Sequence, residues 1–126
     1  MTTLTITERK NNDVLILDLE GKIGIGNGCP EFHEAVRLLV ERGEKKILLN
    51  MANVSYVDSS GLGELVSGYT TFEKNVGVMK LLHLSSKVNE LLKITRLFTV
   101  FDIYSNEIEA VESFTNQPIK LVAANV

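Results

Sequence analysis

Two adjacent serines behind an aspartate are the residues of this chain best placed to do chemistry. Residues 57–63 read Val-Asp-Ser-Ser-Gly-Leu-Gly and lie where a strand pattern gives way to a helix pattern. Ser and Asp are common helix N-caps because their side chains accept hydrogen bonds from unpaired backbone N–H groups. A hydroxyl at a helix N-terminus also lies where the helix favours negative charge. Ser59 and Ser60 are therefore candidates for reversible phosphorylation, and a plain capped strand–helix junction is the alternative.

Other catalytic chemistry has weaker support in the sequence. The residues around the serine pair do not form the Gly-x-Ser-x-Gly elbow of many serine hydrolases. Nothing in the spacing brings His33 or His83 to the pair as a general base. One cysteine, Cys29, and two scattered histidines offer no cluster of metal ligands. We therefore expect no enzyme activity and no bound metal, and we expect Cys29 to be a loop or cap residue.

A glycine-rich segment, residues 24–28, has the sequence Gly-Ile-Gly-Asn-Gly. Its third glycine comes one position too early for the Gly-x-Gly-x-x-Gly loop of dinucleotide-binding folds. The acidic residue about 20 positions later precedes a strand, whereas in those folds it ends one. Gly61-Leu62-Gly63 lacks the Lys and Ser/Thr of a phosphate-binding loop. These segments predict tight turns at the surface and no nucleotide cofactor.

Composition limits the classes of partner. The chain has 126 residues, 44% of them apolar, with 13 basic and 16 acidic side chains and a formal net charge of -3. This balance gives no general attraction to nucleic acid or to an anionic membrane. A single cysteine excludes an intramolecular disulfide, and the residue pattern leads us to expect neither a signal sequence nor a membrane-spanning run. We expect a cytoplasmic protein with no membrane or nucleic-acid partner.

The elements that must position the serine pair alternate between strand and helix. Strand patterns are expected over residues 3–7, 14–19, 47–51, 78–84 and 100–104. Helix patterns are expected over residues 30–42, 59–75, 85–95 and 106–114. The turn cluster at residues 11–13 joins the first two strands into a hairpin, and residues 21–28 are expected to form a loop. The order predicts a single α/β domain over residues 1–114, followed by a tail over 115–126. Its sheet is expected to be mixed, mostly parallel and five-stranded, opened by a β-hairpin, with about four α-helices packed on it.

The helix after the serine pair has one apolar face. Leu62, Leu65 and Phe72 follow helical spacing and are expected in the core, whereas Glu64 and Ser67 lie off that stripe and are expected outside.

The serine motif and its flanks, residues 54–65, resemble the signature of the STAS domain family, in particular its bacterial anti-sigma factor antagonists. The similarity continues through the preceding strand, residues 46–51, and through residues 81–85 and 88–98 that follow. It covers about residues 4 to 114. The strand and helix order worked out above agrees with the fold of that family.

The resemblance implies a phosphorylation-controlled switch in transcription regulation. In the antagonists, the serine directly after the aspartate, which matches Ser59, is phosphorylated by an anti-sigma factor that is itself a serine kinase. The unphosphorylated antagonist binds that kinase and releases the sigma factor; a phosphoserine phosphatase later restores the bound state. Ser60 is expected to enter the helix, where its hydroxyl can bond to backbone. The protein itself would need no cofactor, because ATP is used by the kinase.

The resemblance also implies a partner-binding surface. Its expected members are Gly21, Lys22, Ile23, Gly24, Asp58, Ser59, Ser60, Gly61, Glu64 and Ser67. Many antagonists carry a pattern like Gly-Glu-Leu-Asp where this chain has Gly-Lys-Ile-Gly at residues 21–24, a departure that bears on the identity of the partner. The alternative function is a STAS interaction subunit of a stress-signalling complex, or a soluble component of a transport system, in which Ser59 is only a cap.

Overall fold

Alternating apolar residues open the fold as a β-hairpin. In the computed structural model, which describes residues 4–115, β1 (Leu4–Asn11) pairs antiparallel with β2 (Val14–Ile23). The turn between them places Asn12 at a φ of 58°, a left-handed conformation that Asn tolerates better than most residues. The predicted hairpin is therefore confirmed.

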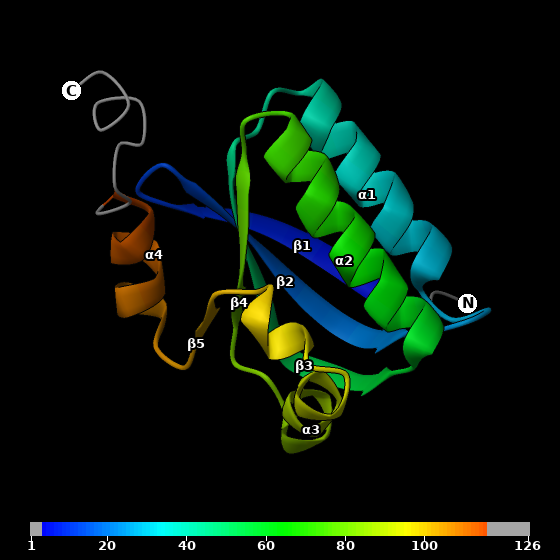
Figure 1. The fold of residues 1–126 in the computed structure, drawn as a ribbon. Coiled ribbons are helices and arrows are strands. Elements are labelled where there is room, and N and C mark those ends of the chain that lie inside the picture. The colour runs from blue at the N-terminus through cyan, green and yellow to red at the C-terminus, as the bar shows by residue number, and fades with distance from the viewer. Residues whose placement is uncertain (1–3, 116–126) are drawn as a thin grey trace.

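Three further strands extend the hairpin into one five-stranded sheet (Figure 1). They are β3 (Lys46–Val57), β4 (Val78–Leu82) and β5 (Ile103–Tyr104), and each pairs in parallel with the strand before it. The strand order across the sheet is β1-β2-β3-β4-β5. This is the mixed, mostly parallel sheet that the alternation of strand and helix patterns predicts.

The helices divide between the two faces of the sheet. On one face, α1 (Cys29–Glu41) and α2 (Ser59–Lys74) lie side by side, and α3 (Ser86–Ile94) follows β4 at the lower edge (Figure 1). On the other face lies α4 (Glu107–Thr115). Successive strand residues point to opposite faces, so Leu15 and Leu17 pack with the first three helices while Val14 and Ile16 pack with α4.

Helix α2 carries the expected apolar face. Leu62, Leu65 and Phe72 are buried, because their spacing brings them to the side of the helix that lies on the sheet. Glu64 is half-buried and Ser67 is exposed, as expected for residues off that stripe.

Some element boundaries differ from those predicted. Strand β2 continues through Gly21 to Ile23, because β3 runs on to Val57 and supplies pairing partners beyond two register shifts. The loop predicted over 21–28 is therefore confined to residues 24–28. Strand β4 ends at Leu82, and the strand expected over 100–104 is reduced to β5, after a 3₁₀ turn over Leu97–Thr99.

The predicted tail begins at the last residue of α4 and otherwise lies outside the described residues, so its boundary remains a prediction.

An ionic cluster ties α4 to the hairpin. The Arg9 guanidinium donates to Asp18 Oδ2 at 2.6 Å and to Glu107 Oε1 at 2.7 Å. Asn11 Nδ2 also donates to Glu107 Oε2, at 3.0 Å. These hydrogen bonds with Arg9 are the main reason that the pKa values of both carboxyls lie below their ordinary values. We call this cluster of Arg9, Asn11, Asp18 and Glu107 the α4 clasp.

Candidate phosphorylation site and partner surface

The serine pair lies at the edge of the sheet where the parallel strands end. Strands β2 and β3 finish side by side, with Ile23 paired to Val57. The backbone N–H of Asp58 then donates to the carbonyl of Ile23 at 3.4 Å. This arrangement brings the loop after β2, residues 24–28, against the first turn of α2.

The Asp58 carboxylate caps α2 and holds the neighbouring loop at the same time. Its Oδ1 accepts the Gly61 N–H at 2.9 Å, and its Oδ2 accepts the Ile25 N–H at 3.0 Å. These two backbone hydrogen bonds, Gly61 first, lower the pKa of the Asp58 carboxyl below its ordinary value. Asp58 therefore stays ionised and joins two segments that are 33 residues apart.

Ser59 and Ser60 are the first two residues of α2, and both are exposed. Asp58, not Ser59, is the N-cap. Within residues 4–115, neither serine hydroxyl makes a hydrogen bond, so the backbone bond expected for the Ser60 hydroxyl is absent there. Each hydroxyl is open to solvent at the positive end of a helix, where added negative charge is favoured.

Two glycines let the loop and the helix approach each other closely. A Cβ added at Gly61 would lie 1.8 Å from the carbonyl oxygen of Ile23, far inside any allowed contact. A Cβ added at Gly24 would lie 2.7 Å from Asp58 Oδ2. Any side chain at position 24 would therefore meet the Asp58 carboxylate and the Tyr56 ring in their present positions.

The residues predicted for the partner surface differ in exposure. Lys22, Ser59, Ser60 and Ser67 are exposed, while Gly21, Asp58 and Glu64 are half-buried. Ile23, Gly24 and Gly61 are buried. Any role of these three in binding is to position their neighbours.

Sequence reasoning missed two exposed apolar side chains beside the serine pair. Ile25, at the tip of the loop, is 75% exposed, and Tyr56, near the end of β3, is 47% exposed. Tyr56 pairs with Lys22 across the β2–β3 ladder. The sequence did carry a signal for Ile25, which lies between two glycines of a predicted turn. A side chain at the tip of a loop has no core to pack against, so its exposure could have been predicted.

The two histidines lie apart from the serine chemistry considered above. His33 Nδ1 lies 3.3 Å from Glu64 Oε1, so it faces the helix α2 carboxylate. His83 follows β4 in a left-handed conformation with a φ of 58°. Neither makes a hydrogen bond with a serine hydroxyl in the described part of the chain.

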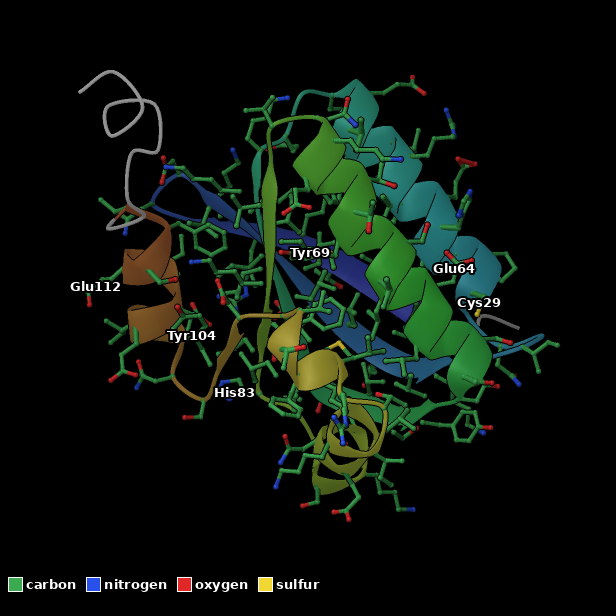
Figure 2. All side chains as sticks on the ribbon, viewed as in Figure 1. Cys29, Glu64, Tyr69, His83, Tyr104 and Glu112 are labelled. Atoms are coloured by element: carbon green, nitrogen blue, oxygen red, sulfur yellow. The ribbon has the colours of Figure 1, made fainter. Side chains whose placement is uncertain are left out.

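Cys29 lies at the start of α1, at the same end of the helix pair as Glu64 (Figure 2). Partial burial, and then the nearby Glu64 and Asp58 carboxylates, raise the pKa of its thiol. A thiol in such surroundings is a poor nucleophile. Between residues 4 and 115, no group of three His, Cys, Asp or Glu side chains could hold a metal ion. The described helices include none of the length and hydropathy needed to cross a bilayer.

Comparison with known proteins identifies the family of this chain. The STAS domain family model matches residues 5–110. The anti-sigma F factor antagonist of Paenibacillus polymyxa is 28% identical over 107 residues, 85% of this chain and 92% of that protein. The anti-sigma-B factor antagonist of Bacillus subtilis is 29% identical over 100 residues, 79% of this chain and 90% of that protein.

A solved structure gives the same result for the fold. A crystal structure of a candidate anti-sigma factor antagonist from Thermotoga maritima has a TM-score of 0.76 and 26% identity, with 86% of this chain and 92% of that chain covered. The family model spans most of the chain, and the TM-score of this relative shows the same fold. The chain therefore belongs to the STAS domain family.

Proposed function

We propose that this protein is an anti-sigma factor antagonist controlled by phosphorylation of Ser59. In its unphosphorylated form it binds an anti-sigma factor that is also a serine kinase, and so releases a sigma factor to transcription. The kinase inactivates it by phosphorylating Ser59, and a phosphoserine phosphatase reverses the change. The protein is cytoplasmic, is not an enzyme and uses no cofactor of its own.

The observation that carries this proposal is the separation of the helix cap from the serine hydroxyl. Asp58 accepts the capping hydrogen bond from Gly61, and the Ser59 hydroxyl makes no hydrogen bond with the described residues. A kinase can therefore modify Ser59 without removing a bond that the fold needs. The similarity to two proteins named anti-sigma factor antagonists supports the choice of partner.

Phosphorylation of Ser59 would change the surface more than the fold. A phosphoserine adds about -1.5 to -2 charges at neutral pH. The N-terminus of α2 offsets part of that charge within the free protein. At an interface, the same charge beside the Asp58 carboxylate adds repulsion and a desolvation cost, so the partner is released while the domain stays folded.

The partner surface includes the exposed Lys22, the turn at Asp58, Ser59 and Ser60, and the outer side of α2 at Glu64 and Ser67. Lys22 gives this surface a positive charge beside the serine pair. Ile25 and Tyr56 add apolar area there, which suits a protein partner because interfaces favour aromatic and apolar anchors.

The test is binding and phosphorylation with the purified anti-sigma factor kinases encoded in the same genome. After incubation with kinase and ATP, tandem mass spectrometry should find phosphate on Ser59. In calorimetric titrations, Ser59→Ala should bind like wild type and resist inactivation, whereas Ser59→Asp should bind much more weakly.

Ser60→Ala is the matched control, and it should be phosphorylated and released as wild type is. Phosphate found only on Ser60 would contradict the choice of residue. Equal binding of Ser59→Asp and wild type, with equal thermal melts, would favour the interaction-subunit function.

A further inference from the structure

The outer faces of α1 and α2 enclose a groove of about 290 Å³. Its walls come from residues spaced along two turns of each helix, and its lining consists of His33, Val36, Arg37, Val40, Glu41, Glu64, Ser67, Gly68 and Thr71. We call it the α1–α2 groove. The capping hydrogen bonds of Asp58 do not involve its floor.

The floor is apolar because of a glycine. A Cβ at Gly68 would lie 3.2 Å from Phe32 Cε2 and 3.3 Å from Val36 Cγ2. Gly68 therefore lets the helices approach closely and leaves a hollow where another residue would place a side chain. Val36 and Val40 form the opposite side of that hollow.

Charged and polar side chains on the rim contact one another. Arg37 forms ion pairs with Glu34 and Glu41, and the His33 ring faces Glu64 at 3.3 Å. Arg37 therefore keeps its carboxylate partners when an apolar group enters the groove, so no unpaired cation is buried, a cost that would otherwise oppose binding.

The groove lies within reach of any partner that covers the serine pair. An interface of standard size buries about 800 Å² on each protein, which corresponds to a radius of about 16 Å for a circular patch. At 1.5 Å per residue, Gly68 lies about 12 Å along the helix from Ser60. Glu64, one turn from Ser60, borders both the serine pair and the groove.

We propose that the α1–α2 groove receives an apolar side chain of the anti-sigma factor, as an anchor separate from the phosphorylated turn. This inference rests on the proposed function, and it adds a second contact between the two proteins to the one at the serine pair. Affinity at protein interfaces is concentrated in apolar or aromatic anchors that fill pockets. The anchor supplies affinity, and the charge on Ser59 decides whether the surfaces can close over it.

The first test fills the groove from its rim. Ser67→Phe places a phenyl ring over the hollow, and Lys74→Phe places the same ring on the last turn of α2, outside the groove lining. Binding of each unphosphorylated variant to the purified kinase is measured by calorimetry, alongside thermal melts. Ser67→Phe should bind about tenfold more weakly or worse, while Lys74→Phe should stay within about twofold of wild type.

The second test needs no substitution. In methyl NMR spectra of valine-labelled protein, the Val36 and Val40 signals should shift when the kinase saturates the protein. Unchanged binding by Ser67→Phe, or unchanged methyl signals in the complex, would overturn the proposal while leaving the antagonist function intact. Signals that respond to a low-molecular-weight extract and not to the kinase would mark a small-molecule site and also overturn it. If wild type binds no kinase, the proposed function and the groove proposal fail together.

Discussion

Two strand–helix junctions at the same edge of the sheet use their serines differently. At the junction of β4 and α3, Ser85 is the N-cap, and its hydroxyl accepts the Val88 N–H at 3.3 Å. At the junction of β3 and α2, the Asp58 carboxylate is the N-cap and accepts the Gly61 N–H. Ser59 follows it, and its hydroxyl makes no hydrogen bond within residues 4–115. A serine that caps a helix is tied to the fold, whereas a serine placed after a carboxylate cap is available for modification.

The β3–α2 junction is also the more tightly packed of the two. Gly61 meets the Ile23 carbonyl, and Asp58 reaches across to the Ile25 amide. The β4–α3 junction has a backbone hydrogen bond of its own, from the His83 N–H to the Tyr104 carbonyl at 2.9 Å, but within residues 4–115 the Ser85 side chain bridges to no other loop. Backbone contacts therefore hold the turn beneath Ser59, while the Ser59 side chain itself is exposed.

The largest expected effect on stability comes from a substitution that disrupts the packing under the serine pair. Gly61→Ala should lower the free energy of unfolding by about 3 kcal/mol or more, because the new Cβ overlaps a backbone carbonyl that cannot move away alone. Gly63→Ala is the matched control, since a Cβ there meets nothing within 4 Å. That change should stabilise the helix by up to about 1 kcal/mol. Denaturant unfolding measures the free energy of unfolding of both variants. Equal values would contradict the close approach of Gly61 to the Ile23 carbonyl.

The next largest effect is expected at the helix caps, where substitutions of Asp58 and Ser85 can be compared directly. Asp58→Ala should destabilise the protein more than Ser85→Ala, because it removes acceptors from both Gly61 and Ile25. Ser85→Ala removes one weak capping bond and should cost about 1 kcal/mol. Urea midpoints measure both changes. A larger loss for Ser85→Ala would mean that the Asp58 bridge to the loop contributes little.

Acid should loosen one junction and spare the other. The folded-state pKa of Asp58 is depressed, so its stabilising bonds are fully present above the ordinary carboxyl pKa of about 4 and are lost as pH falls through the lower folded value. The Ile25 and Gly61 amide signals should therefore shift together in an NMR titration from pH 7 to pH 2.

Two internal controls accompany that titration. The Val88 amide, bonded to the neutral Ser85 hydroxyl, should not follow the same curve. Asp58→Asn should abolish the shared transition, and its persistence in that variant would assign it to another carboxylate.

The smallest expected effect is on the free serine. Ser59→Ala should change the free energy of unfolding by less than about 0.5 kcal/mol, as is usual for a surface side chain without partners. Against the loss expected for Ser85→Ala, this small value separates a modifiable serine from a capping one. A loss for Ser59→Ala as large as that for Ser85→Ala would show that its hydroxyl is tied to the fold after all.

Much of the fold follows from patterns that the sequence displays. Helical spacing places Leu62, Leu65 and Phe72 in the core, and alternation with a turn cluster predicts the opening hairpin. The lengths of β2 and β3 could not be predicted, because their ladder continues past two register shifts that depend on pairing between distant residues.

The site was predictable as a place but not in its hydrogen bonds. The order of residues indicates a helix start at the serine pair, yet both Asp58 and Ser59 are good caps by residue type. Only the folded chain shows that Asp58 takes the cap, since the Ile25 amide that fixes its second oxygen is far away in sequence. The α1–α2 groove depends on the distance between two helices, which no local pattern encodes.

The α4 clasp has a consequence for synthesis of the protein on the ribosome. Arg9 emerges 98 residues before Glu107, its ion-pair partner on α4. Domains generally fold as units during synthesis. Until α4 arrives, Val14, Ile16 and Leu48 on the second face of the sheet have no cover. We therefore expect the nascent chain to be most prone to aggregation just before its last helix is made.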